Sequence, residues 1–136
     1  MRTEPIPRHD QFGYIKMRKA GKLAAETLDY IAPFVKAGVT TLELNDLCHQ
    51  FITDHDAIPA PLGYKGFPKA TCISVNHVVC HGIPSEKRLI DGDIVNIDIT
   101  VILDGWYGDT SRMYWIGEPN VKAKRLTDVT YQAMMR

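Results

Sequence analysis

The chain has 136 residues, 45% of them hydrophobic, and its 16 basic side chains balance 16 acidic ones. This size and composition predict one globular domain, and the balanced charge excludes the positive field that nucleic acid or an anionic membrane surface would attract. The sequence has no run of about 18 apolar residues, which excludes a helix that crosses a membrane.

Residues 1–11 form a polar leader. They contain two prolines and several charges where a secretory signal would need an apolar core of about 7–15 residues. The three cysteines, Cys48, Cys72 and Cys80, show no C-x-x-C spacing and fit reduced thiols better than a disulfide framework. We therefore expect a cytoplasmic protein.

Two helices are predicted in the first half of the chain. The first covers about residues 12–36, and Pro33 would kink or end it in the last turn. Apolar residues at steps of three and four give it one buried stripe of Tyr14, Met17, Gly21, Ala24, Leu28, Ile31 and Val35. Thr40 and Glu43 have the spacing of a capping box at the start of the second helix. Its apolar face consists of Leu44, Leu47, Cys48, Phe51 and Ile52.

The middle of the chain is rich in turn residues. From Ala57 onward, prolines and glycines alternate with aromatic residues, and this texture predicts a shaped loop that ends near residue 70. A short strand is expected over residues 71–75, followed by a second loop-rich segment over 77–93. A last helix is predicted over 121–136, where apolar residues again have helical spacing.

A β-hairpin is the strongest local pattern. Asp93–Leu103 and Trp106–Trp115 are rich in β-branched and aromatic residues, and Asp104 and Gly105 between them are the favoured two-residue turn. Side chains alternate between the two faces of a strand. One face of the first strand is wholly apolar and consists of Val95, Ile97, Ile99, Val101 and Leu103.

The opposite face of the hairpin carries two aspartates. A two-residue turn places Asp109 opposite Thr100 and Ser111 opposite Asp98, so Asp98 and Asp109 are diagonal neighbours. Two carboxylates so close together need a cation or a shared proton, and we therefore hypothesise a site for divalent metal ions, with a pair about 3.5–4 Å apart as one form. The alternative is that both aspartates are solvated on an exposed sheet face. The polar neighbours on this face, Asn96, Thr100 and Ser111, suit either interpretation.

Other candidates lie in the two loops. His81, between Cys80 and Gly82, could project into a cleft as a hydrogen-bond donor or proton carrier, although a surface histidine is the alternative. A zinc site of His77, His81 and the cysteines is disfavoured because no finger-like spacing exists. Three apolar loop residues could wall a pocket or simply pack the loop, namely Leu62, Tyr64 and Phe67.

Two segments together closely resemble the type I methionine aminopeptidases of bacteria. They are LGYKGFPKATCISVNHVVCHGIP, residues 62–84, and DGDIVNIDITVILDGWYGDTSRMY, residues 91–114. The resemblance runs from the first helix to the end of the chain and implies an α+β pita-bread fold, in which two similar halves face each other across a metal site. Residues 12–136 would be the amino-terminal half, with two helices, an antiparallel β-hairpin sheet and a further helix.

The resemblance also implies a reaction and its metal ligands. Asp98 and Asp109 would bind two divalent metal ions, which could be cobalt, manganese, iron or zinc. His81 would be the substrate-side histidine, placed to donate to the scissile amide or to the tetrahedral intermediate. Metal-activated water would remove the initiator methionine from nascent polypeptide N-termini, with the ribosome as one place of encounter.

The pocket for the methionine side chain would be lined by Pro61, Tyr64, Phe67 and Cys72. The family often has Cys at the position of Pro61 and Tyr at the position of Phe67, and both differences keep the pocket apolar. From its residues alone, Cys72 could equally be an ordinary buried thiol.

The remaining ligands of the family, one histidine and two glutamates, come from its second half, and no residue after Asp109 matches their motifs. We therefore expect this chain to need a carboxy-terminal half to complete the site, to be inactive alone, and to expose apolar surface. Two alternatives remain. One is a noncatalytic module that binds peptide N-termini on the same fold, and the other is a different pita-bread hydrolase such as a proline dipeptidase relative.

Overall fold

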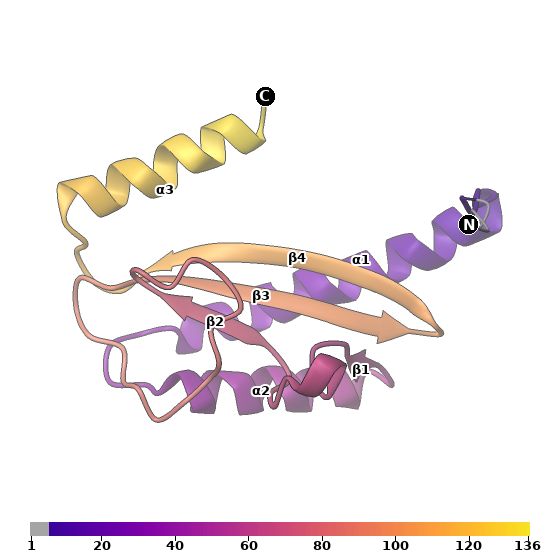
Figure 1. The fold of residues 1–136 in the computed structure, drawn as a ribbon, viewed down its shortest axis with the longest axis horizontal. Coiled ribbons are helices and arrows are strands. Elements are labelled where there is room, and N and C mark those ends of the chain that lie inside the picture. The colour runs from indigo at the N-terminus through magenta and orange to yellow at the C-terminus, as the bar shows by residue number, and fades with distance from the viewer. Residues whose placement is uncertain (1–5) are drawn as a thin grey trace.

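The computed structural model describes residues 6–136, so the first five residues of the predicted leader lie outside the described part of the chain. Three helices and four antiparallel strands make up the fold (Figure 1). In chain order the elements are α1 Gln11–Ile31, the 3-10 turn η1 Ala32–Phe34, α2 Thr41–Asp54, β1 Ile58–Pro59, the 3-10 turn η2 Tyr64–Gly66, β2 Cys72–Val75, β3 Ile94–Leu103, β4 Trp106–Trp115 and α3 Val121–Met134.

Helix α1 occupies most of the predicted range, but its buried stripe differs from the prediction at its beginning. Tyr14 and Met17 are 56% and 45% exposed, so their assignment to the buried stripe was wrong. The small residues Gly13 and Ala20 are buried instead. The reason is a close backbone approach, since a Cβ added to Gly108 of β4 would lie 2.2 Å from the carbonyl of Ala20. The two backbones lie so close together here that only small residues fit between them.

The start of α2 is the predicted capping box. The Thr40 backbone N–H donates to Glu43 Oε2 over 2.7 Å, and the Glu43 N–H donates to Thr40 Oγ1 over 3.0 Å. This pair satisfies two of the backbone donors that a helix start leaves free. The predicted apolar face packs inward, with Leu44, Cys48 and Ile52 fully buried.

The β3–β4 hairpin has the predicted register over its whole length. Leu103 pairs with Trp106, and the intervening Asp104 and Gly105 have φ angles of +51° and +80°. Positive φ at both central residues matches the type I′ turn, whose twist suits a two-residue hairpin. The turn chemistry therefore fixes which residues of β3 and β4 face each other.

Two short strands pair with the other edge of β3. β2 confirms most of the predicted strand at residues 71–75. The expectation that everything from Ala57 onward is loop was wrong, because Ile58 and Pro59 form β1, paired with Ile102 and Val101. Proline has no N–H to donate and is tolerated at a strand edge, where its presence hides a short strand from sequence patterns.

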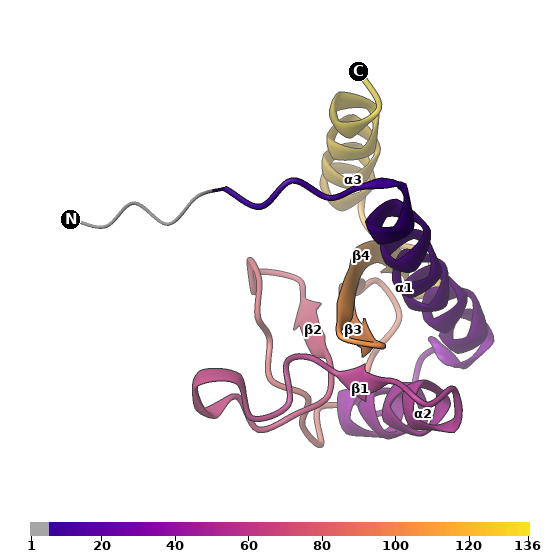
Figure 2. The same cartoon turned by 90° about the vertical axis from the view of Figure 1, so that its right-hand side faces the viewer.

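The two faces of the sheet have different roles. Helices α1 and α2 cover one face, as Figure 2 shows, and four apolar residues of β3 on that face are fully buried in the core with them. These strand residues are Val95, Ile97, Ile99 and Val101. The apolar face predicted for the hairpin is thus the core, and the opposite face is left for other contacts.

Helix α3 is the predicted last helix and stands apart from the other elements (Figure 1). None of its residues is buried, and its apolar side chains Leu126, Val129 and Met134 are all more than half exposed. Trp115 Nε1 donates to Thr127 Oγ1 over 3.0 Å and ties the helix to β4. The expected exposed apolar surface is therefore present on α3. Within residues 6–136, no helix is both long enough and apolar enough to cross a membrane.

Candidate functional site

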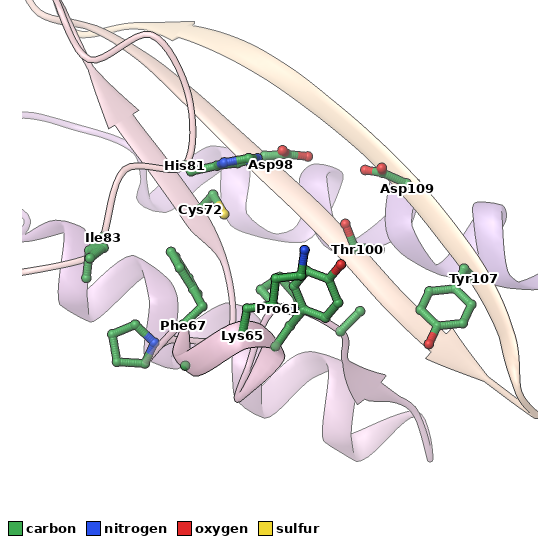
Figure 3. A pocket seen from close by; sticks show the side chains of 14 residues that line it. Pro61, Lys65, Phe67, Cys72, His81, Ile83, Asp98, Thr100, Tyr107 and Asp109 are labelled. Atoms are coloured by element: carbon green, nitrogen blue, oxygen red, sulfur yellow. The ribbon is translucent and has the colours of Figure 1, made fainter.

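Asp98 and Asp109 lie on the sheet face opposite the core. Asp98 pairs with Ser111 and Asp109 pairs with Thr100, as the two-residue turn predicted. Figure 3 shows the two carboxyl groups turned toward the same space between the strands. The sheet therefore holds two carboxylates side by side, with rigid, hydrogen-bonded backbone beneath them.

The surroundings of Asp98 disfavour its charge. Burial raises the pKa of Asp98 above its ordinary value, and the negative charge of Asp109 raises it further. A hydrogen bond that protonated Asp98 can donate to Asp109 acts in the same direction, while His81 opposes these effects. A bound cation would remove the repulsion between the carboxylates and favour the charged form of both.

The wall of the site is an excursion from the sheet. The Ala60 N–H donates to the Thr100 carbonyl over 2.9 Å, and the chain returns to β3 where Cys72 pairs with Asp98. The intervening residues, 61–71, leave the sheet beside one end of the aspartate pair and rejoin it beside the other. This path explains how a loop far away in sequence comes to flank Asp98 and Asp109.

His81 is held in the site by its neighbour Gly82. The Ile73 N–H donates to the Gly82 carbonyl over 2.9 Å, and the Gly82 N–H donates to Ser74 Oγ over 3.0 Å. A Cβ at Gly82 would lie 2.2 Å from the Ile73 carbonyl oxygen, so only glycine fits. His81 itself has a φ of +51°, a left-handed conformation that costs energy for a non-glycine residue. Its ring points toward Asp98 (Figure 3).

One pocket of about 950 Å³ contains all seven residues that the sequence singled out as site residues. They are Pro61, Tyr64, Phe67, Cys72, His81, Asp98 and Asp109. Apart from Lys65 its wall is mainly apolar, and its floor carries the two carboxylates, an arrangement typical of sites that take a ligand with one apolar and one charged part. Leu62, which we had considered as a third wall residue, does not line this pocket.

Sequence reasoning missed six residues that line the pocket, namely Ala60, Lys65, Gly66, Pro68, Ile83 and Tyr107. Tyr107 could have been found, because it lies two residues before Asp109 on β4 and so shares its face. Lys65 and Ile83 lie in irregular segments, where no periodicity reveals the direction of a side chain. Thr100, considered as a polar neighbour of the aspartates, does line the pocket.

Cys72 combines burial with membership of the pocket. Burial raises the pKa of its thiol to about 11, and the negative charges of Asp98, Cys80 and Asp109 contribute in that order. A thiol with so high a pKa stays protonated at neutral pH and behaves as a small apolar wall group. All three cysteines are free, as the sequence predicted.

The donor set fits part of a metal site. Carboxylate oxygens suit divalent ions, and the crowding of Asp98 and Asp109 needs a positive charge. Among residues 6–136 no three His, Cys, Asp or Glu side chains form a group that could hold a metal ion. The further ligands that we expect from a carboxy-terminal half stay a prediction.

Comparison with known proteins places these features in a family. The profile of metallopeptidase family M24 matches residues 15–136. The methionine aminopeptidase of Rickettsia prowazekii is 70% identical over 128 residues, which are 94% of this chain and 49% of that protein. The methionine aminopeptidase of Escherichia coli K12 is 53% identical over 121 residues, which are 88% of this chain and 46% of that protein. The chain spans about half the length of the curated relatives it matches.

Solved structures agree. The crystal structure of methionine aminopeptidase from Rickettsia prowazekii matches with a TM-score of 0.94 and 69% identity, over 96% of this chain and 53% of that chain. The Xaa-Pro dipeptidase from Bacillus anthracis matches with a TM-score of 0.77 and 21% identity, over 93% and 34%, which is a likeness of fold alone. These matches confirm the predicted α+β pita-bread fold and the resemblance to bacterial methionine aminopeptidases. The chain therefore belongs to metallopeptidase family M24.

Proposed function

We propose that this chain supplies one side of the active site of a metal-dependent aminopeptidase that removes methionine from polypeptide N-termini. The observation that carries the proposal is the pocket itself, where Asp98, Asp109 and His81 meet an apolar wall. Identity of 70% to a methionine aminopeptidase over 94% of the chain supports the same conclusion. The whole protein's activity would need the ligands that we expect from a carboxy-terminal half.

Asp98 and Asp109 would be metal ligands. Divalent ions bound there, two in the form that we propose, would supply Lewis acidity and lower the pKa of a water molecule. The aspartates themselves would fix the position of this positive charge, since both extend from paired strands with fixed register.

His81 would act on the substrate side. The tight turn at Gly82 fixes its backbone, and its ring lies beside Asp98. From there an imidazole N–H could donate to the scissile amide and to the oxyanion that develops when the carbonyl is attacked. Donors fixed before the reaction contribute most, because they need no reorganisation in the transition state.

The apolar wall would bind the methionine side chain. Pro61, Tyr64, Phe67 and Cys72 line the pocket beside the carboxylates, so an unbranched apolar side chain could extend along them while its amino group stays near the charges. We expect the second residue of the substrate to be small.

Nascent polypeptides in the cytoplasm, met at the ribosome, would be the natural substrates. Three free cysteines, including one in the pocket, support a reducing compartment. The equal numbers of acidic and basic residues support a peptide rather than a nucleic acid as partner.

The two alternatives fit less well. A noncatalytic binding module has no need of two carboxylates so close together that Asp109 adds to the raised pKa of Asp98. Against a proline dipeptidase relative, the identity to such an enzyme is only 21%, compared with 70% to a methionine aminopeptidase.

The test is an assay of methionine release with protein expressed from its full open reading frame. Peptides beginning Met-Ala should release methionine when manganese or cobalt is added, and chelation should stop release. Asp98→Ala should abolish it, whereas Asp54→Asn, at an exposed carboxylate on α2, should not. Tight peptide binding without release would instead favour the noncatalytic module, and release by residues 1–136 alone would contradict the need for further ligands.

A further inference from the structure

Among the residues that line the pocket, Lys65 is the only lysine or arginine. Figure 3 shows this side chain reaching from η2 into the pocket, toward β3. The pocket thus contains two carboxylates on the sheet and an ammonium on the wall. A ligand that fits it would meet charges of both signs.

The backbone of Lys65 is left-handed, with φ +47° and ψ +33°, between Gly63 and Gly66, which also have positive φ. The Gly63 N–H donates to the Phe67 carbonyl over 2.8 Å and closes this tight loop. A left-handed backbone costs energy for residues other than glycine. Glycine would adopt this conformation without that cost, so the loop geometry does not explain why a lysine stands here.

In the described part of the chain, the ammonium group of Lys65 has no acidic partner. The ion pairs formed within residues 6–136 use Lys16, Lys22, Arg112 and Lys124. Lys65 Nζ instead lies over the Tyr64 ring, 5.5 Å from its centroid. A cation–π contact at an exposed site is weak and leaves the donors of the ammonium group free for an anion.

We propose that Lys65 selects substrates by charge, by binding a carboxylate of the bound peptide beyond the cleaved bond. This inference rests on the proposed function. The cleaved bond of the first residue would lie at the metal ions that Asp98 and Asp109 would hold, and its apolar side chain along the pocket wall. The carboxylate that meets Lys65 must therefore come from a later residue, either as an acidic side chain or as the free C-terminus of a short peptide.

The experiment measures kcat/KM for methionine release by protein from the full open reading frame. The substrates are Met-Ala-Glu amide, Met-Ala-Gln amide and Met-Ala-Gln with a free C-terminus. An exposed ion pair supports a preference of about two- to fivefold for an anionic substrate over the neutral amide. Preference for the Glu amide identifies an acidic side chain as the source, and preference for the free acid identifies the C-terminus.

Variants assign the preference to Lys65. Lys65→Met should bring the ratio of anionic to neutral substrate close to one, Lys65→Glu should invert it, and Lys65→Arg should retain it. Lys69→Met is the matched control, because Lys69 lies in the same loop but does not line the pocket, and it should keep the wild-type ratio. In the wild type, the preference should also shrink as salt is raised, since screening weakens an exposed ion pair.

The possible failures are distinguishable. If wild-type protein releases methionine from anionic and neutral substrates equally well, the role of Lys65 is overturned but the proposed function stays intact. A preference that survives in Lys65→Met also overturns it. No release from any of the three substrates in the presence of metal overturns the proposed function, and the role of Lys65 with it.

Discussion

Asp98 and Asp109 stand one diagonal step apart across β3 and β4, because Asp98 lies opposite Ser111 and Asp109 opposite Thr100. Their side chains share a face whose reverse side is the fully buried core. Neither strand can therefore rotate or slip to separate the two charges without exposing apolar residues. The fold itself maintains the repulsion between these carboxylates.

Removing one charge should stabilise the metal-free protein. Burial of Asp98 and the negative charge of Asp109 raise the pKa of Asp98 above its ordinary value of 3.8. The charged form of Asp98 therefore costs stability at neutral pH. Asp98→Asn should raise the free energy of unfolding in chelator at about pH 7. The gain should shrink as pH falls through the raised pKa, because folded wild type then binds the proton. Urea denaturation across this range measures it, and an Asp98→Asn protein less stable than wild type at neutral pH would contradict the argument.

Adding metal should reverse this order. A ligand that binds only the folded state stabilises it by about 2.7 kcal/mol at a concentration of 100 times Kd. Manganese should therefore raise the melting temperature of wild-type protein from the full open reading frame, and chelation should lower it again. Asp98→Asn and Asp109→Asn should each lose most of this shift. An equal shift in Asp98→Asn would show that the metal binds elsewhere.

The contact between α1 and β4 should tolerate no side chain at Gly108. A Cβ there would lie 2.2 Å from the Ala20 carbonyl and 2.5 Å from the Gly21 nitrogen. Gly108→Ala should lower the free energy of unfolding by about 1–3 kcal/mol, as overpacking does. Gly21→Ala is the matched control, because its Cβ would meet nothing within 4 Å and alanine favours a helix by about 0.8–1 kcal/mol. Chemical denaturation should thus give changes of opposite sign for the two variants.

Gly82→Ala should affect the site more than the fold. Its Cβ would clash with the Ile73 carbonyl at 2.2 Å, and the exposed loop can move away more easily than β2 can. Displacing the loop would move His81 from the carboxylates. We expect a loss of about 1–3 kcal/mol in stability and a clear fall in kcat for methionine release. A variant with normal kcat would show that the position of His81 is not critical.

The three thiols should differ in reactivity. Cys80 is exposed, whereas burial raises the pKa of Cys72 to about 11 and that of Cys48 to about 12. Thiolate is the reactive form, so a neutral alkylating reagent at about pH 7 should modify Cys80 first, Cys72 slowly and Cys48 only on unfolding. Peptide mass mapping after timed alkylation gives the order. Faster labelling of Cys72 than of Cys80 would contradict it.

Local chemistry made the hairpin predictable. Asp104 and Gly105 specify a two-residue turn, and the alternation of side chains then fixes every pair in β3 and β4. The capping box at Thr40 is equally local, because both partners lie within one helical turn. In each case the sequence contains all the groups that determine the geometry.

Features that depend on distant contacts were harder to predict. The buried stripe of α1 begins at Gly13 rather than Tyr14, since the approach of β4 favours small residues there, and hydrophobicity does not reveal such an approach. Strand β1 has only two residues, one of them a proline, so its pairing with β3 is a tertiary effect. Lys65 entered the pocket through a left-handed loop that no periodic pattern describes. The roles of the individual site residues remain predictions.

The two-residue turn at Asp104 and Gly105 also limits how this protein can change. Inserting one residue there while the turn keeps two residues would shift the register of β4 by one, so Asp109 would face the core and Gly108 would leave its contact with α1. Inserting two residues would keep both on their faces. A single inserted residue should therefore survive only where the loop itself lengthens to three residues and every β3–β4 pair is kept.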